Sequence, residues 1–290
     1  MRRPRQLDAA RVAVIFAASL IALKFFAFLQ TGSVAMLASL VDSLLDALAS
    51  GINLFAIYLA LAPADREHRF GHGKAEPLAA LAQSAFIAGS GLFVLIHAAG
   101  RASQSRSPVI DGHVGVVVMV VAILGTAALV VYQRRVARET GSLVIAADSV
   151  HYLSDLLANL AVIAALLLAG QPALWWVDPL MAALIAGYVM VGAWRVGRQA
   201  LDQLMDHEWA EARRRRVLAI AQGIPGVLGV QDLRTRSAGP QHFVQLSIDL
   251  AADLPLAQAH AVAHHVSEAI ISAEPGTEVI VHQEPVDPSH

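Results

Sequence analysis

One stretch of the sequence, residues 34–61, is apolar enough to cross a membrane but carries two aspartates. A helix needs about 20 apolar residues to span a bilayer, and this stretch is long enough. Asp42 and Asp46 are four residues apart, so on a helix both carboxylates point from one face, one turn apart. Placing one carboxylate at membrane depth costs at least ~2.5–3.5 kcal/mol. A bound cation is the simplest way to offset the cost of burying two.

A second apolar stretch, residues 143–168, carries His151 and Asp155 with the same spacing. Two such pairs on facing helices can supply the four tetrahedral ligands that zinc prefers. We therefore expect one metal site formed by Asp42, Asp46, His151 and Asp155. This donor set also suits Cd²⁺, Fe²⁺, Co²⁺ or Mn²⁺, but the imidazole favours Zn²⁺. Because the same groups bind protons, metal and protons compete for them, which is the physical basis of an exchange.

The composition restricts the class of protein. Of 290 residues, 56% are hydrophobic and only 15% are charged, which is typical of a membrane protein with a polar appendage. The formal net charge of −2 gives no reason to expect nucleic acid as a partner. Cysteine is absent, which excludes disulfides and thiolate metal sites. Any metal must therefore be held by carboxylate, imidazole or carbonyl groups.

Residues 1–205 are predicted to form a transmembrane domain of six spans. The apolar runs cover residues 12–29, 34–61, 77–99, 114–132, 143–169 and 179–196. Six spans place both termini on the same side of the membrane. Basic residues gather near the N-terminus, in residues 65–74 and 133–141, and after the last run. By the positive-inside rule, both termini are expected in the cytoplasm.

Two polar residues inside these runs receive structural interpretations. Lys24 is expected either to extend its ammonium group toward the membrane surface or to pair inside the bundle, and no function is assigned to it. Asn53 is expected to form a hydrogen bond between helices rather than to bind a substrate.

Residues 206–290 are more polar and are predicted to form a small α+β domain with the element order αββαβ. The predicted elements are a helix over 210–222, strands over 227–236 and 243–250, a helix over 255–271 and a strand over 278–283. A core of this size is marginally stable alone, which favours association with a second copy of the chain.

The loop after the second apolar run contains Asp65, His68 and His72. A short loop can bring one carboxylate and two imidazoles onto a single metal ion. The alternative is a set of solvated loop residues with a turn at Gly71 and Gly73. The spacing alone does not favour one interpretation over the other.

Four motifs, LVDSLLD, PADREHRFGHGKAE, ADSVHYLSD and DLRTRSAGP followed by VIVHQEP, resemble the cation diffusion facilitator family. Within that family they are most similar to the bacterial ferrous-iron and zinc efflux pumps of the YiiP type. The resemblance runs from about Val12 to Pro285, nearly the whole chain. It implies a homodimer of six-helix protomers in the lipid of the bacterial inner membrane, each with a cytoplasmic domain of metallochaperone-like fold. It also implies export of divalent metal in exchange for protons by alternating access.

The resemblance assigns roles to residues already noted. It implies that the transport site consists of Asp42, Asp46, His151 and Asp155, and that a second site in the loop consists of Asp65, His68 and His72. It further implies that Lys74 and Asp206 form an ion pair between subunits at the hinge between membrane and cytosol. This pairing follows from the resemblance alone.

The C-terminal domain departs from the family pattern. The family has a two-metal site there, built mainly from histidines, at positions that hold Gln231, Ser247, His260, His282, Gln283 and Glu284 in this chain. Because Gln231 and Ser247 replace histidines, one metal has lost ligands. We expect a reduced site for a regulatory metal formed by His260, His282, Glu284 and, as a further candidate, Gln283. His282 and Glu284 share one face of a strand, and His260 is expected to reach them from its helix.

Two other classes of protein are alternatives to a proton-coupled exporter. A metal-dependent intramembrane protease needs an open water position and a general base, but the chain has no HExxH motif and its intramembrane ligand set is closed. A membrane-anchored metal sensor would use its spans only as an anchor, and a plain anchor has no reason to bury charges. The sequence therefore favours a transporter over an enzyme, with the sensor as the alternative.

Overall fold

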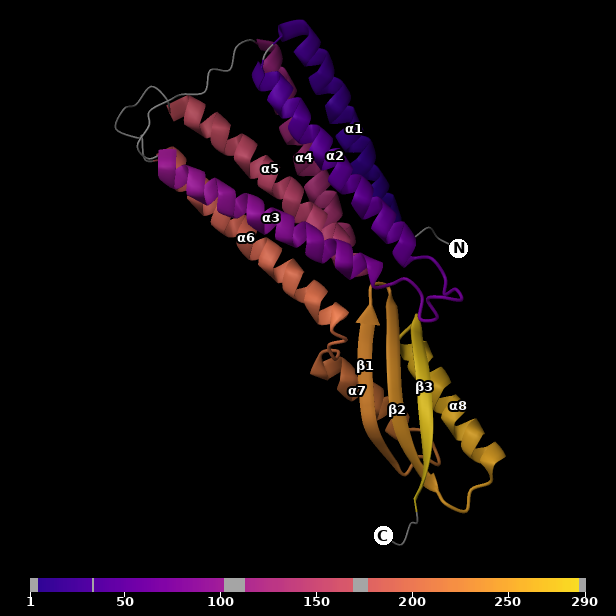
Figure 1. Cartoon of the computed structure of the whole chain (residues 1–290). Coiled ribbons are helices and arrows are strands. Elements are labelled where there is room, and N and C mark those ends of the chain that lie inside the picture. The colour runs from indigo at the N-terminus through magenta and orange to yellow at the C-terminus, as the bar shows by residue number, and fades with distance from the viewer. Residues whose placement is uncertain (1–4, 33, 102–112, 169–176, 287–290) are drawn as a thin grey trace. The chain divides into compact units, whose positions relative to one another are not determined.

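The computed structural model describes residues 5–32, 34–101, 113–168 and 177–286 (Figure 1). The chain divides into two compact units, Met1–Leu201 and Asp202–His290. Each unit has its own hydrophobic core.

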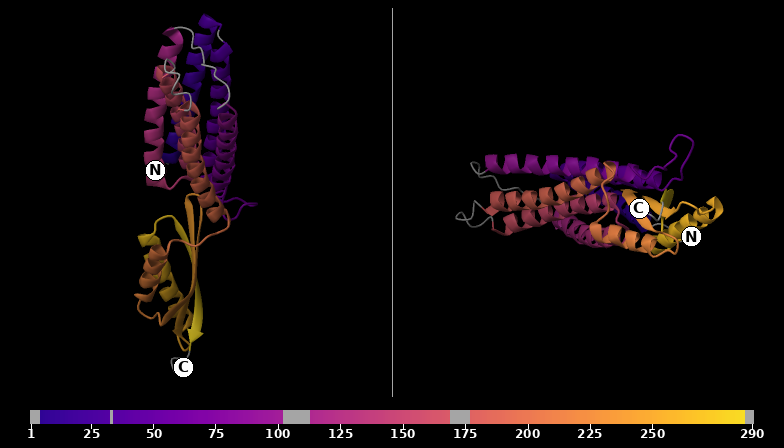
Figure 2. Two further views of the ribbon diagram at one scale, coloured as in Figure 1. Left: turned by 90° about the vertical axis from the view of Figure 1, so that its left-hand side faces the viewer. Right: turned by 90° about the horizontal axis from the view of Figure 1, so that it is seen from below.

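The first unit is a bundle of long helices that lie side by side (Figures 1 and 2). Its helices are α1 (Arg5–Thr31), α2 (Val34–Ala60), α3 (Ala75–Arg101), α4 (His113–Thr140), α5 (Leu143–Leu168) and α6 (Val177–Leu204). Five of them are long and apolar enough to cross a membrane. The sixth, α5, has 26 residues and carries two aspartates and a histidine. The predicted six-helix transmembrane bundle is confirmed.

Several helices extend beyond the apolar runs that predicted them. The fourth run ends at Tyr132, but α4 continues through a basic segment to Thr140. Arg135 Nε donates a 3.0 Å hydrogen bond to Glu139 one turn later, and Arg5 of α1 pairs with the same carboxylate. Gly141, with a φ of 70°, ends the helix in the left-handed conformation that glycine adopts readily. The apolar run thus predicts the helix but not its end, which lies at the left-handed Gly141.

Helix α5, which carries His151 and Asp155, begins at a polar cap. The Ser142 hydroxyl accepts a 3.4 Å hydrogen bond from the N–H of Ile145, as an N-cap side chain does. That hydroxyl also donates to the buried carboxylate of Glu76 on α3, which in turn accepts from backbone N–H groups at the start of α5. A negative charge at a helix N-terminus is favourable. Glu76 therefore fixes the start of α5 against α3.

The second unit has the predicted order αββαβ. Its elements are α7 (Glu211–Gln222), β1 (Gly229–Ala238), β2 (Gln241–Ala251), α8 (Leu256–Ala273) and β3 (Thr277–Val286). The sheet order is β1-β2-β3, with β1 antiparallel to β2 and β3 parallel to β2 through the α8 crossover. The predicted α+β fold is confirmed. Strand β1 begins and ends two residues later than predicted, and β2 and β3 are one to three residues longer at each end than the alternation indicated.

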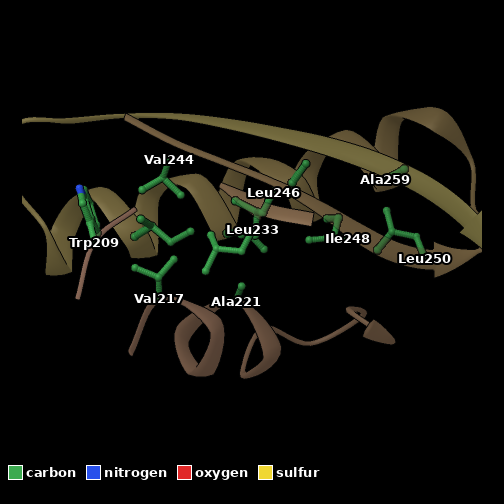
Figure 3. Packing of buried hydrophobic residues seen from close by; sticks show 12 residues of the cluster. Trp209, Val217, Ala221, Leu233, Val244, Leu246, Ile248, Leu250 and Ala259 are labelled. Carbon is green, nitrogen blue, oxygen red and sulfur yellow. The ribbon is translucent and has the colours of Figure 1, made fainter. Parts of the chain in front are cut away.

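Helices α7 and α8 lie on one face of this sheet, and their apolar side chains form a common core with the strands (Figures 2 and 3). Strand β2 contributes alternate residues to that core: Val244, Leu246, Ile248 and Leu250. On β3, Val279 and Val281 pack against the same core. Side chains at the intervening positions, including Ser247 and His282, therefore point from the face that the helices leave uncovered.

Candidate metal centre

Helices α2 and α5 bring three candidate ligands together inside the transmembrane bundle. His151 Nε2 lies 3.0 Å from Asp46 Oδ1 and 3.9 Å from Asp155 Oδ2. One ligand atom from each of the three residues lies within 4.8 Å of the others. Ligands bound to one zinc ion at about 2.0–2.2 Å lie roughly 3.4 Å apart in a tetrahedron. The observed spacing therefore suits three ligands of one small cation.

Asp42, the fourth predicted ligand, lies one turn before Asp46 on α2 and does not belong to this group of three. Asp42 is exposed, and its carboxylate interacts electrostatically with that of Asp155 on α5. The structure thus assembles three of the four predicted ligands and keeps the fourth nearby.

Aromatic and hydroxyl groups hold the imidazole in place. The ring centroid of His151 lies 6.4 Å from that of Phe86 on α3 and 5.7 Å from that of Tyr152. The Tyr152 hydroxyl forms a 2.9 Å hydrogen bond with the hydroxyl of Ser50 on α2. The hydrogen bond and the ring contacts fix the orientation of α5 relative to α2 beside the ligands.

Another carboxylate on α5, that of Asp148, is fully buried and is not among the candidates identified from the sequence. It is 1% exposed and accepts hydrogen bonds from three side-chain amides on three other helices. Asn53 of α2 donates at 2.9 Å, Gln83 of α3 donates at 3.2 Å, and Gln133 of α4 also donates. The prediction that Asn53 bonds between helices is confirmed. Because Asp148 lies one turn before His151, this network fixes the ligand-bearing part of α5 in the bundle.

Lys24 of α1 pairs inside the bundle, which is one of the two interpretations given to it. Its Nζ donates a 2.7 Å hydrogen bond to Ser43 Oγ and a 3.1 Å hydrogen bond to the backbone oxygen of Ser39, both on α2. It also interacts electrostatically with Asp46 and Asp155. The sequence did not show that this ammonium group belongs to the surroundings of the candidate metal ligands.

The loop between α2 and α3 brings together its three candidate ligands. His68 Nδ1 lies 3.4 Å from Asp65 Oδ1, and His72 Nε2 lies 3.3 Å from Asp65 Oδ2. The two imidazole centroids are 4.5 Å apart, and one ligand atom from each of the three residues lies within 4.8 Å of the others. The arrangement is compatible with a single metal ion bound by one carboxylate and two imidazoles.

The backbone of this loop is organised around the same carboxylate. Asp65 Oδ1 accepts hydrogen bonds from the N–H of His68 at 2.6 Å and the N–H of Glu67 at 2.9 Å. The N–H of His68 is the main cause of a lowered pKa of Asp65. Gly71, with a φ of 75°, supplies the turn that returns the chain to His72. Asp65 therefore has a structural role in the turn as well as the chemistry of a ligand.

The candidate ligands of the C-terminal domain lie on both faces of its sheet. Gln231, Ser247 and His282 are direct neighbours across the three strands. The Gln231 amide donates to both carboxylate oxygens of Asp249, at 2.9 and 2.8 Å. Glu284 is the neighbour of Asp249 on β3 and shares its strand face with His282.

The other two candidates of this domain lie elsewhere. Gln283 alternates with His282 and is the neighbour of the core residue Ile248, so its side chain leaves the opposite face. His260 is exposed on α8, with its ring centroid 6.5 Å from that of His264. Within the described part of the chain, no group of three or more donor atoms within 4.8 Å includes a residue of this domain.

The residues of the expected inter-subunit ion pair lie in different units. Lys74 directly precedes α3 in the first unit, and Asp206 follows α6 in the second. Asp206 has a positive φ of 55°, and Arg236 Nη1 lies 3.4 Å from its Oδ1.

Comparison with known proteins identifies the same two parts of the chain. Residues 10–205 match the cation efflux transmembrane domain, and residues 210–286 match the cytoplasmic domain of cation efflux proteins. The match to the solved structure of CzrB in its zinc form covers 28% of this chain and 93% of the CzrB chain, at 34% identity and a TM-score of 0.27. The match to the solved MamM C-terminal domain covers 26% of this chain and 98% of the MamM chain, at 28% identity and a TM-score of 0.25.

Curated relatives match over nearly the full length. The cation-efflux pump FieF of Shewanella oneidensis is 48% identical over 278 residues, which are 96% of this chain and 93% of the relative. FieF of Klebsiella pneumoniae is 43% identical over 279 residues, which are 96% of this chain and 92% of the relative. The resemblance noted in the motifs is thus confirmed: the chain belongs to the cation efflux, or cation diffusion facilitator, family, whose members are multi-pass membrane transporters of divalent metal cations and not enzymes.

Proposed function

We propose that this transporter exports Zn²⁺ from the bacterial cytoplasm in exchange for protons. The observation that carries the proposal is the group of Asp46, His151 and Asp155, contributed by two membrane-spanning helices. An imidazole among carboxylates favours Zn²⁺ over metals that prefer an all-oxygen site, while Cd²⁺ and Fe²⁺ remain compatible substrates. Asp42, one turn away, is the fourth ligand once the ion is bound.

Proton coupling follows from the chemistry of these donors. A carboxylate or imidazole must lose its proton to bind metal, so each metal that enters displaces protons and each proton that returns weakens the metal site. The donors lie on α2 and α5, and a rocking of helices around a fixed site exposes it alternately to the two sides of the membrane. Protons entering from the outer side then expel the metal there.

The same proposal includes a topology and an assembly. Both termini lie in the cytoplasm, because basic residues gather near the N-terminus, in residues 65–74 and 133–141, and after the last apolar run, which all lie on one side of the membrane. The protein forms a homodimer in the lipid of the inner membrane, with residues 1–205 as the transmembrane domain and residues 206–290 as the cytoplasmic domain. The match to the cytoplasmic domain of cation efflux proteins supports this assembly. Lys74 and Asp206 form an ion pair between its subunits.

Two further metal sites belong to the proposal. The loop site of Asp65, His68 and His72 captures metal at the cytoplasmic surface, which the convergence of its three donors supports. The C-terminal domain binds a regulatory metal through His282 and Glu284, which share a sheet face. His260 and Gln283 lie on other surfaces of the same domain, so within one chain they do not face the ion bound by His282 and Glu284.

Zinc flux into proteoliposomes with an imposed pH gradient tests the proposal. We expect flux that follows the gradient in the wild type and disappears in Asp46→Ala. The matched control, Asp253→Ala, removes an exposed carboxylate of the second unit and should leave the flux unchanged. Zinc binding without flux in either the wild type or the control would instead support a membrane-anchored metal sensor.

A further inference from the structure

We propose that Lys24 is a fixed counter-charge of the transport site, which matches the site to a divalent cation and promotes release of that cation. The inference rests on the proposed function of Asp46, His151 and Asp155. The structure brings this ammonium group to the ligands from a third helix, α1, which contributes none of them.

Two hydrogen bonds position the ammonium group. Lys24 Nζ donates to Ser43 Oγ at 2.7 Å and to the oxygen of Ser39 at 3.1 Å. Ser43 is 1% exposed and precedes Asp46 by three residues, so both side chains lie on the same face of α2. The positive charge is therefore held within about one helical turn of a metal ligand.

The ammonium group is close enough to interact electrostatically with the carboxylates, but it forms no direct ion pair with them among the described residues. Lys24 interacts electrostatically with Asp42, Asp46 and Asp155. Among the ion pairs of the described residues, which join atoms within 4.0 Å, none includes Lys24. The carboxylate oxygens thus remain available to a metal, while the lysine lowers the negative potential at the position of the ion.

The charges around the site add up to a specific preference. Counted apart from Asp148, whose carboxylate accepts hydrogen bonds from three amides, the three ligand carboxylates and the ammonium group carry a formal charge of −2, which a divalent cation neutralises. A site without the lysine would remain negative after a divalent ion had bound, and a net charge at membrane depth is unfavourable. Such a site would hold its ion more tightly and release it more slowly. For a transporter, tighter binding reduces turnover because the ion must leave in every cycle.

A purely structural lysine is a poor explanation of this arrangement. Ser43 and Ser39 are neutral partners, and a neutral donor would serve to link α1 to α2 at a lower cost of desolvation. Burying an ammonium group is reasonable where nearby negative charges offset its cost, and those charges are the candidate ligands.

The test is the zinc dependence of efflux by the full chain in proteoliposomes, at a fixed pH gradient. For Lys24→Met, which removes the charge and keeps an unbranched side chain, we expect KM to fall about tenfold, which is about 1.4 kcal/mol of tighter binding. The maximum rate should fall as well, because release is slowed. Lys24→Arg should restore both values to within about twofold, since it keeps the charge.

Each other outcome has a defined meaning. An unchanged or raised KM in Lys24→Met, or equal behaviour of the Met and Arg variants, would overturn the counter-charge role. If Lys24→Met does not fold, Ser43→Ala still tests the inference, since releasing the ammonium group should lower KM in the same direction and an unchanged KM would contradict it. Asp46→Ala separates the two proposals. Efflux retained in Asp46→Ala would refute the transport site. Efflux lost in Asp46→Ala, together with an unaltered KM in Lys24→Met, would refute only the counter-charge role.

Discussion

His151 Nε2 on α5 lies 3.0 Å from Asp46 Oδ1 on α2, although the two residues are 105 positions apart in the chain. This contact joins the two helices whose aspartate and histidine spacing first suggested a metal site. It also shows how the site is closed: one imidazole nitrogen faces both Asp46 and Asp155. A cation bound there would replace the contact with bonds from all three residues.

The imidazole is expected to determine metal preference. Replacing it in His151→Ala removes the only nitrogen ligand, so zinc efflux should fall at least about tenfold while manganese, which favours oxygen ligands, is affected less. The ratio of zinc to manganese efflux by the variant in proteoliposomes measures this effect. His265→Ala, which removes an exposed histidine of α8, is the control. An unaltered ratio in His151→Ala would count against this role.

The buried Asp148 network is expected to contribute to stability. Asp148→Ala leaves the amides of Asn53, Gln83 and Gln133 without their shared acceptor. Hydrogen bonds between membrane helices contribute about 0.6 kcal/mol each on average, so three should amount to about 2 kcal/mol. Thermal unfolding in detergent should show this loss, with a smaller one for Asp148→Asn, which keeps an acceptor oxygen. A melting temperature equal to that of Asp253→Ala would contradict the prediction.

The parts of the fold that follow from hydrophobicity were predictable from one sequence. Long apolar runs indicate the six helices, and the alternation of Val244, Leu246, Ile248 and Leu250 indicates β2. Helix ends were less predictable. The apolar run stops at Tyr132, but α4 continues to Thr140, with Val136 packed in the core and an ion pair between Arg135 and Glu139.

Contacts between helices were the part that the sequence did not reveal. The spacing of Asp42 and Asp46, like that of His151 and Asp155, shows which residues share a helix face. It does not show that Asp148 meets amides from three other helices, or that Lys24 lies beside the ligands, because both depend on how the helices are rotated and staggered. It also does not show that α8 covers the sheet face opposite His282.

Asp65 is expected to combine a structural and a ligand role that two substitutions separate. Asp65→Asn keeps an oxygen to accept the N–H groups of Glu67 and His68, so the turn should survive while metal binding by the loop is lost. Asp65→Ala should lose both. Amide chemical shifts of Glu67 and His68, with metal titration, measure the two effects. If Asp65→Asn binds metal as the wild type does, the carboxylate is not a ligand.

The lowered pKa of Asp65 predicts how the turn responds to acid. A carboxylate whose pKa is lower in the folded state stabilises that state above its unfolded-state pKa of about 3.9. That contribution is lost only as the pH falls through the lower folded-state value. We therefore expect the turn, followed by the protection of the His68 N–H from hydrogen exchange, to persist on acidification to about pH 4 and to be lost below it. A change centred above that pH would contradict the prediction.

The sheet of the C-terminal domain offers a test of the lost metal. Gln231, Ser247 and His282 are neighbours in one row across three strands, where side chains of adjacent strands lie about 4.5–5.5 Å apart. Gln231→His combined with Ser247→His would place three imidazoles in that row. We expect the natural fragment of residues 206–290, which has its own core, to bind at most one Zn²⁺ per chain. The double variant should bind one more, as counted by equilibrium dialysis and metal analysis. Two ions bound by the unsubstituted fragment would show that the domain keeps two metal sites although Gln231 and Ser247 replace histidines. The ligands of those sites would then be other residues.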